Sequence, residues 1–402
     1  MTRLLTLSNL FPSEEFPRHG IFVEERLRQL LATGRVEAKV FAPVPWFPFK
    51  SARFGTYGRY ARVARQEERL GCQVRYPRFP LIPKVSMAIA PLLMAMAVYR
   101  HLRVLEREWL DTAIIDAHYL YPDGVAAVLL GKWLRRPVVL TARGQDVTLL
   151  PEYRIPRAWI KWACARAAHV VTVSESLRHG LVDLGVSPAK LSCLRNGVDL
   201  KKFQPQERTA LRRDLGMEGM VLLAVGNLIE LKGHALIIAA LGELPDAQLH
   251  LIGEGPEQDS LAELARQLGV SQRCYFHGNM PHTQLAHFYN AADALVLPSS
   301  REGMPNVVLE ALACGTPVIA TAVGGVPELI DSEDVGVLLQ DRSSAAIAAG
   351  VRELQANPCD RDTVRRHGEG LGWSSTVDGL LGLYAEIGEN GTRAGPNIGA
   401  AG

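Results

Sequence analysis

Short aliphatic and β-branched runs alternate with helical patterns along the whole chain. They predict strands at residues 4–8, 38–42, 113–117, 138–142 and 170–174 in the first half, and at 221–226, 248–253, 274–278, 294–298 and 317–321 in the second. These runs are continuously apolar, which is typical of parallel strands covered by helices on both faces. Each half is therefore expected to be a doubly wound α/β domain.

Polarity suggests where these domains begin and end. The polar stretch 199–213 is interpreted as the linker, which places an N-terminal domain at 1–198 and a C-terminal domain at 199–370. A helix over 371–387 is expected to follow and could return to the first domain. The tail 388–402 is rich in glycine and short of apolar residues, so we expect it to be disordered.

The segment REGMPNVVLEALACGTPVIAT (301–321) sets two carboxylates in apolar surroundings. Pro305 can open a helix and Gly315 can end it, which predicts a helix over about 305–314. That helix is apolar all round except for Asn306 and Glu310, so it should be buried. A buried carboxylate costs several kcal/mol unless it is partnered. The local sequence holds no partner for Glu310, which leaves a distant arginine or the hydroxyls of a bound ribose.

Glu302 precedes the same helix. The free backbone N–H groups at this helix N-terminus could bind a phosphate. Alternatively, the Glu302 carboxylate only complements the positive end of the helix dipole. Four other loops follow predicted strands at the same sheet edge and carry glycines. They read GNLIELKGH (226–234, with Lys232), GEGP (253–256), HGN (277–279) and AVGGVPEL (322–329). Glycine lets the backbone approach a ligand closely, so this edge is the predicted binding edge of the second domain.

Composition describes a soluble protein with room for two hydrophobic cores, at 402 residues, 48% hydrophobic and 21% charged. The six cysteines are far apart and no apolar leader opens the chain, so we expect a cytoplasmic protein without disulfides. The longest apolar run, 85–99, is shorter than the roughly 20 residues of a membrane span and is interrupted by Pro91. It is expected to form a core helix.

Charge is divided unevenly. Residues 1–200 hold 29 Lys and Arg against 17 Asp and Glu, a net +12, whereas the remainder holds 15 against 25, a net −10. Nine of the cations fall within 50–84, interleaved with aromatic residues. Such a stretch suits an anionic surface such as a membrane, although a solvated loop and helix face would look the same.

These motifs resemble those of the family-4, GT-B-fold retaining glycosyltransferases. Glu302 and Glu310 match the E-x7-E signature of that family. Further matches are FPRHGIFVEERLRQL (16–30), DAHYLYPDG (116–124), TARGQDV (141–147), VSESL (173–177), NGVD (196–199), VGNLIELKGH (225–234) and LIGEGP (251–256). The resemblance covers nearly the whole chain and implies two Rossmann-like domains that face a cleft.

The resemblance also implies roles for particular residues. Glu310 would hold the nucleotide ribose, Glu302 the hydroxyls of the donor sugar, and Lys232 the diphosphate. His118 would lie beside the reaction centre, so the implied catalytic residues are His118, Glu302 and Lys232. The implied donor-binding residues are Gly20, Asn227, Lys232, Glu254, Glu302, Gly303, Met304, Asn306 and Glu310.

One position departs from the family pattern. Asn227 stands where the family often has an arginine, so one phosphate charge lacks its usual partner. Arg143, Arg301 or backbone amides could compensate. Arg143 and Asp146 are candidates for the acceptor side or for phosphate, but they could equally form a structural ion pair.

The expected reaction is transfer of a hexose-type sugar from a nucleotide-diphosphate donor to a glycan or polyprenyl-linked acceptor, as in envelope or exopolysaccharide synthesis. Retention is implied by the family. The chain offers no DxD-type acidic pair suited to a metal, so we expect neither a metal nor another cofactor. We also expect no nucleic-acid partner. The protein could attach peripherally to the inner face of the membrane.

A GT-B-like sugar-nucleotide epimerase and a non-catalytic membrane-surface protein remain alternatives. A Rossmann oxidoreductase is disfavoured, because NLFPSEEFPRHG (9–20), and not GxGxxG, follows the first strand.

Overall fold

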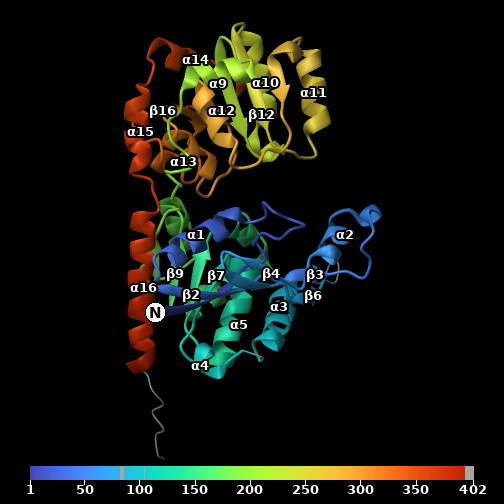
Figure 1. The fold of residues 1–402 in the computed structure, drawn as a ribbon, viewed down its shortest axis with the longest axis vertical. Helices are drawn as coiled ribbons and strands as arrows, with labels where there is room; N and C mark the ends of the chain where they lie inside the picture. The colour runs from blue at the N-terminus through green and yellow to red at the C-terminus, as the bar shows by residue number, and fades with distance from the viewer. Residues whose placement is uncertain (82–85, 104, 394–402) are drawn as a thin grey trace, which may run out of the picture. The chain divides into compact units, whose positions relative to one another are not determined.

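The structure is a computed structural model that describes residues 1–81, 86–103 and 105–393. The chain divides into two compact units, which Figure 1 shows as a ribbon. The first unit comprises Met1–Arg195 and Ser374–Gly402, and the second comprises Asn196–Trp373. The chain therefore passes from one unit to the other twice.

The first unit is built on a sheet in the order β10-β9-β8-β7-β1-β2-β5-β4, in which only β4 runs antiparallel to its neighbour. A separate parallel pair is formed by β3 and β6. The strands are β1 (Thr2–Leu7), β2 (Val36–Phe41), β3 (Val44–Trp46), β4 (Gln66–Arg69), β5 (Cys72–Arg75), β6 (Arg78–Pro80), β7 (Ile114–His118), β8 (Val138–Ala142), β9 (His169–Thr172) and β10 (Leu191–Cys193).

Helices cover this sheet in two groups. Helices α3, α5 and α7 contact one another, whereas α16 contacts α1 and β1. Figure 1 shows α3 and α5 side by side. The helices are α1 (Ile21–Ala32), α2 (Gly55–Arg62), α3 (Ser86–Leu102), α4 (Arg107–Leu110), α5 (Val125–Leu134), α6 (Gln145–Thr148), α7 (Arg154–Arg166), α8 (Glu175–Asp183) and α16 (Ser374–Arg393).

The second unit has a wholly parallel sheet in the order β13-β12-β11-β14-β15-β16. Its core includes Leu222, Leu249 and Ile319 from three strands, all fully buried. The strands are β11 (Met220–Val225), β12 (Ala247–Ile252), β13 (Cys274–Phe276), β14 (Ala294–Leu297), β15 (Val318–Thr321) and β16 (Gly336–Leu339). The helices are α9 (Arg208–Leu215), α10 (His234–Ala240), α11 (Gln258–Gln267), α12 (Leu285–Ala291), α13 (Asn306–Ala313), α14 (Ser344–Ala356) and α15 (Arg361–Glu369).

Each of the ten strands predicted from apolar runs overlaps a strand of the structure, and both units are doubly wound α/β as expected. The predicted helix over 305–314 is α13, and the predicted core helix within 85–99 is part of α3. The prediction missed β3, β4, β5, β6, β10 and β16. Each of these strands is only three or four residues long. Their apolar runs are either absent, as in β4 (QEER), or too short to stand out, as in β16 (GVLL).

The predicted division at 198/199 lies close to the observed one at 195/196, but two other predictions were wrong. The stretch 199–213 is not simply a linker: it belongs to the second unit, where Phe203 is buried against His282 and Tyr289, and α9 already begins at Arg208. The predicted disordered tail began at 388, but residues 388–393 continue α16. The apolar positions of α16 lie before residue 388, and the polar residues 388–393 extend the same helix. Residues 394–402 lie outside the described residues.

Candidate functional site

The strand order of the second unit reverses between β11 and β14, which lie side by side although β12 and β13 separate them in sequence. The loops after β11 and β14 therefore diverge to opposite faces of the sheet and leave a crevice between them. Open α/β sheets bind ligands at such a point. Lys232 follows β11 and Glu302 follows β14, so both predicted residues lie at this switch point.

An ion pair joins these two loops. Lys232 Nζ lies 2.6 Å from Glu302 Oε1, and the two side chains are only 19% and 11% exposed. The backbone around them is closely packed, because Gly233 has φ 70° and a Cβ atom there would lie 2.5 Å from the Pro298 carbonyl oxygen. Arg342 reinforces the contact by donating to the Pro298 carbonyl at 2.9 Å and to Glu230 Oε1 at 2.9 Å.

Glycines bring the neighbouring loops together in the same way. At Gly324, with φ 57°, a Cβ atom would lie 1.8 Å from the carbonyl oxygen of Glu302, and at Gly253 one would lie 1.8 Å from that of Gly226. The Gly253 amide also donates to the Gly278 carbonyl at 2.9 Å. The five loops predicted at this edge are therefore linked by backbone contacts that a larger residue would disrupt.

Glu310 on α13 is 7% exposed, and distant residues supply its partners. Its Oε1 lies 2.7 Å from His282 Nε2, and its Oε2 accepts from the Tyr289 hydroxyl at 2.8 Å. His282 Nδ1 in turn lies 2.5 Å from Lys202 Nζ, so the imidazole links an ammonium to the carboxylate. Burial, followed by the Glu310 charge, raises the pKa of Tyr289 well above its usual range. A carboxylate offers about four lone-pair positions, so Glu310 keeps capacity for ribose hydroxyls.

The other residues expected around the donor lie in the same loops but differ in exposure. Met304 is buried and Gly303 is half-buried, whereas Asn227 and Glu254 are exposed. Asn306 Oδ1 accepts from Asn196 Nδ2 at 3.0 Å, a contact within the second unit.

The first unit has its own switch point, between β1 and β7. Gly20 ends the loop after β1 and caps α1 with φ 73°, where a Cβ atom would lie 1.9 Å from the Leu10 carbonyl oxygen. Asp123 follows β7 and accepts from the Asn9 amide at 2.5 Å. The loop that carries Gly20 is thus tied to the segment after His118.

His118 ends β7, is 1% exposed and has both ring nitrogens engaged. Its Nε2 lies 3.0 Å from Asp116 Oδ2, and its Nδ1 lies 2.7 Å from Arg143 Nη2. Because guanidinium is only a donor, Nδ1 must accept and the proton must sit on Nε2, facing Asp116. Burial lowers the pKa of His118 to about 4 despite the Asp116 charge, so the ring is neutral at neutral pH.

Residues to which the motif analysis assigned no role complete this buried network. Burial opposes ionisation of Asp116, but His118 and Arg26 together hold its pKa well below the usual range. Arg26 comes from α1 and donates to Thr141 at 3.1 Å. Tyr384 comes from α16, is 1% exposed, and interacts with Asp116 and Arg26. Neither α1 nor α16 is near β7 in sequence, so no local signal marks these partners.

Asp146 organises the loop after β8. Its carboxylate accepts from the backbone amides of Leu120, Arg143 and Gly144 at 2.8, 3.0 and 2.7 Å. The Asp146 side chain is fully buried, and burial raises its pKa. The Arg143 side chain reaches His118, and burial lowers the Arg143 pKa to about 9. Asp146 thus positions the backbone on which Arg143 stands.

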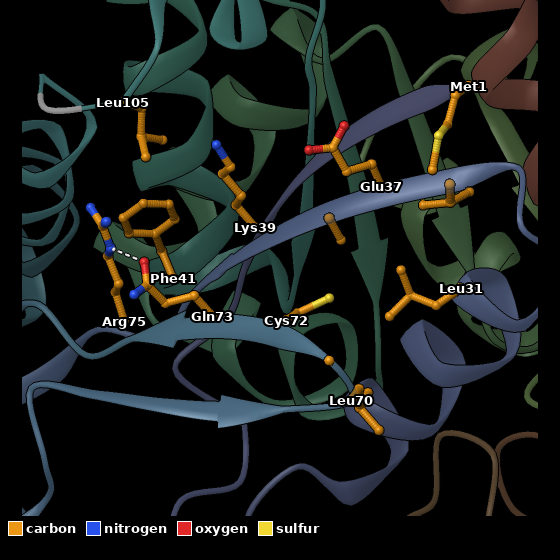
Figure 2. Close-up of a pocket in the computed structure, with 13 residues that line it drawn as sticks. Met1, Leu31, Glu37, Lys39, Phe41, Leu70, Cys72, Gln73, Arg75 and Leu105 are labelled. Carbon is orange, nitrogen blue, oxygen red and sulfur yellow. Dashed lines mark hydrogen bonds between the residues drawn. The ribbon is translucent and has the colours of Figure 1, made fainter.

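Other features of the described chain lie apart from these residues. A pocket of about 390 Å³ on the first unit is lined by Glu37, Lys39, Cys72 and Arg75, among others, and contains no predicted site residue (Figure 2). Burial raises the pKa of the Cys72 thiol, which disfavours a reactive thiolate. Within residues 1–81, 86–103 and 105–393, no helix is long and apolar enough to cross a membrane.

Two doubly wound units, each with its candidate site residues at a switch point, have the architecture of the GT-B fold class. The model for "Glycosyltransferase Family 4" matches residues 56–202, and that for "Glycosyl transferases group 1" matches residues 207–370. TuaC of Bacillus subtilis, named for a glycosyltransferase role in teichuronic acid biosynthesis, is 30% identical over 88% of this chain and 89% of its own length. The chain belongs to the family-4 GT-B glycosyltransferases.

Two further likenesses extend this comparison. The D-inositol 3-phosphate glycosyltransferase of Geodermatophilus obscurus is 36% identical over 69% of this chain and 67% of its own length. The structure of Anabaena Alr3699/HepE in complex with UDP superimposes with a TM-score of 0.70 at 19% identity, covering 97% of this chain and 100% of that one. At that identity the superposition shows the fold.

The carboxyl group of Asp123 should make stability depend on pH. Burial raises its pKa to about 8, whereas an unfolded aspartate titrates near about 3.9. The folded state therefore keeps a proton that the unfolded state loses, and this stabilisation is complete below pH ~4 and is lost as pH rises through ~8. We expect the unfolding free energy of wild type, relative to Asp123→Asn, to fall by up to about 1.4 kcal/mol per pH unit across that range.

Urea unfolding of both proteins at a series of pH values measures this difference. The substitution keeps an acceptor for the Asn9 amide, so the comparison isolates the ionisation. A difference that does not change between pH ~4 and ~8 would show that Asp123 is ionised in the folded protein.

Proposed function

We propose that this protein transfers a hexose from a nucleoside diphosphate sugar to a glycan or lipid-linked glycan acceptor, with retention of configuration and without a metal ion. The observation that carries the proposal is the Lys232–Glu302 pair at the switch point of the second sheet, in the same unit as the buried Glu310. A cation, a sugar-binding carboxylate and a ribose-binding carboxylate are the groups that such a donor requires. The UDP complex of HepE and the name of TuaC support a nucleotide donor and a glycan acceptor.

In this proposal the second unit binds the donor. Glu310 accepts hydrogen bonds from the ribose hydroxyls, with His282 and Tyr289 holding the carboxylate in place. Lys232 leaves Glu302 and neutralises the diphosphate, which frees Glu302 to accept from sugar hydroxyls. This change of partner by Lys232 favours departure of the diphosphate, because a fixed cation stabilises the charge that develops on it.

Transfer with retention requires the acceptor hydroxyl to attack the face from which the diphosphate departs. The C1–O bond to the diphosphate breaks, a C1–O bond to the acceptor forms, and a phosphate oxygen takes the acceptor proton. No protein nucleophile is needed. His118 of the first unit is assigned to the sugar hydroxyls: it is neutral, and its Nδ1 can exchange the Arg143 donor for a hydroxyl donor.

A screen of nucleotide sugars by thermal shift, followed by mass spectrometry of products, tests the reaction. A product heavier than the acceptor by one hexose, formed only when an acceptor is present, is expected. Conversion of the donor without an acceptor would indicate an epimerase or a hydrolase. Binding without conversion of any donor–acceptor pair would favour a non-catalytic protein.

Glu310→Gln should weaken the affinity for the donor's nucleotide by about tenfold or more, because hydrogen bonds to a charged group contribute about 1.5–3 kcal/mol. Isothermal calorimetry with UDP and other nucleoside diphosphates measures this. Tyr289→Phe is the matched control, since it removes one partner of the carboxylate but keeps the charge. Equal affinity of wild type and Glu310→Gln would remove Glu310 from the nucleotide site.

Lys232→Ala should reduce turnover by about a hundredfold, as loss of a transition-state charge contact does. It should weaken binding of a nucleoside diphosphate but not of the nucleoside alone, because only the diphosphate needs the cation. Glu302→Gln controls for the broken ion pair. A chelator should leave wild-type turnover unchanged; a requirement restored by one divalent ion would overturn the metal-free mechanism.

His118→Ala should lower the transfer rate by about a hundredfold while nucleotide affinity stays within about twofold, because His118 lies in the first unit and is assigned to the sugar. Rates, calorimetry and a melting curve on one preparation separate these effects. A variant that melts early but transfers at the wild-type rate below its melting temperature would restrict His118 to a structural role.

A further inference from the structure

Three neighbouring helices of the first unit contain no acidic residue. Helices α3, α5 and α7 have 17, 10 and 13 residues and contact one another on the sheet. Together they carry six cations and no Asp or Glu, in a chain where the two signs are nearly balanced. The cations are Arg100 on α3, Lys132 on α5, and Arg154, Arg157, Lys161 and Arg166 on α7.

The cations of α7 are available to a partner. Arg154, Arg157 and Lys161 are exposed, and within the described part of the chain none of the three forms an ion pair. Their spacing of three and four residues places them along one side of the helix. This side is a cationic strip that no described residue neutralises through an ion pair.

Large apolar side chains are exposed on the same helices. Leu92 and Met96 are 41% and 43% exposed on consecutive turns of α3, Trp133 is 39% exposed on α5, and Ile155 is 47% exposed on α7. Isolated exposed apolar residues are ordinary, but a group of them on adjoining helices marks an interaction surface.

Tryptophans border this surface and are held in place. Trp159 donates to the Ala88 carbonyl of α3 at 3.1 Å and packs edge-on against Trp162, with ring centroids 5.4 Å apart. Trp133 packs edge-on against Tyr99, with centroids 5.6 Å apart. Tryptophan and tyrosine concentrate at the boundary between lipid and water, where one end of the ring is apolar and the other is wet.

A pocket at the ends of α3 and α5 adds a place for a polar headgroup. It has a volume of about 600 Å³ and is lined by Tyr99, Trp133, Arg103 and Arg135, among others. Arg103 and Arg135 are exposed, whereas Arg107 pairs with Asp111 at the rim at 4.0 Å. Two exposed guanidinium groups beside an aromatic pair suit a phosphate group at a lipid surface.

The basic stretch 50–84, where the sequence suggested an anionic partner, is less available. Arg62 pairs with Glu15 at 2.9 Å, and Arg69 pairs with Glu24 at 2.8 Å. Arg78 donates to the carbonyls of Tyr60 and Val63, and Lys84 lies outside the described residues. Several cations of the basic stretch therefore stabilise the fold of the segment that connects β3 to β6.

We propose that the outer surface of α3, α5 and α7 docks the protein on an anionic lipid leaflet. Cations attract the headgroups, and Leu92, Met96, Trp133 and Ile155 enter the boundary with the acyl chains, as in other interfacial helical surfaces. A leaflet fits better than a folded protein partner because the cations and the apolar side chains are interspersed over three helices. The inference deepens the proposed function, since a lipid-linked acceptor is met at a leaflet, but lipid binding is measured without turnover.

The test is co-sedimentation of the full chain with vesicles of phosphatidylcholine containing about one-third phosphatidylglycerol, across a salt series. The docking variant combines Arg154→Gln, Arg157→Gln and Lys161→Gln. Each cation near an anionic leaflet changes partitioning by about fivefold, so this variant should bind about a hundredfold more weakly. The matched control combines Lys201→Gln, Arg213→Gln and Arg266→Gln, which removes the same charge from exposed positions of the second unit and should bind as wild type does.

Two further variants locate the surface. Leu92→Gln with Met96→Gln should weaken binding even at high salt, where the cationic contribution is screened. Arg53→Gln with Arg65→Gln, in the basic stretch, should have a smaller effect than the α7 variant. All four are compared by melting temperature, so that a folding defect is recognised.

The proposal is overturned if wild type stays in solution with these vesicles at low salt, if the α7 variant sediments like wild type, or if the α7 variant and the matched control lose binding equally. Binding to an acidic soluble polymer but not to vesicles would assign the surface to another macromolecule and also overturn the proposal. Failure of the proposed function would give a different result, because the protein would still bind vesicles but would convert no donor. Failure of docking alone would leave transfer to a soluble acceptor intact.

Discussion

The contact between Lys232 and Glu302 is the interaction on which the candidate donor site depends. It spans the point where β11 and β14 send their loops to opposite faces, and it holds a cation and a carboxylate 2.6 Å apart in a largely buried position. Such a pair is stable only if both partners stay in place, because a single charge there would be costly. The glycine contacts at Gly233 and Gly324, together with Arg342, keep the loops close enough for the pair to form. A diphosphate can compete for Lys232 because it offers a stronger negative charge than one carboxylate.

The first unit contains an ionised carboxylate that is buried beside a neutral imidazole. Asp116 is 2% exposed and stays ionised because His118 and Arg26 compensate its burial. The imidazole then has a defined tautomer, with its proton toward Asp116 and its Nδ1 turned toward Arg143. A ring fixed in this way could offer Nδ1 to a ligand that displaces Arg143, without a proton transfer beforehand. The network thus favours a role in orienting a substrate over a role as a general base.

The two units also differ in how they use charge. The acidic second half places Lys232 at the switch point and several other cations in structural pairs, such as Arg342 with Glu230. In the first unit, cations within 50–84 are largely drawn into the fold, whereas those on α7 remain exposed. A net charge computed from sequence does not separate these cases, because both kinds of cation contribute equally to it.

The sequence by itself determined the two doubly wound units, the loops that carry Lys232 and Glu302, and the helix that carries Glu310. Continuous apolar runs specify buried parallel strands, and such strands bring their following loops to one edge, so these features depend only on local pattern. The partners of those residues were decided by tertiary structure. His282 and Tyr289 meet Glu310, and Tyr384 meets Asp116, across separations that no periodicity records. Short strands such as β4 and β10 escaped prediction for a similar reason, since they gain their stability from a neighbouring strand rather than from an apolar run of their own.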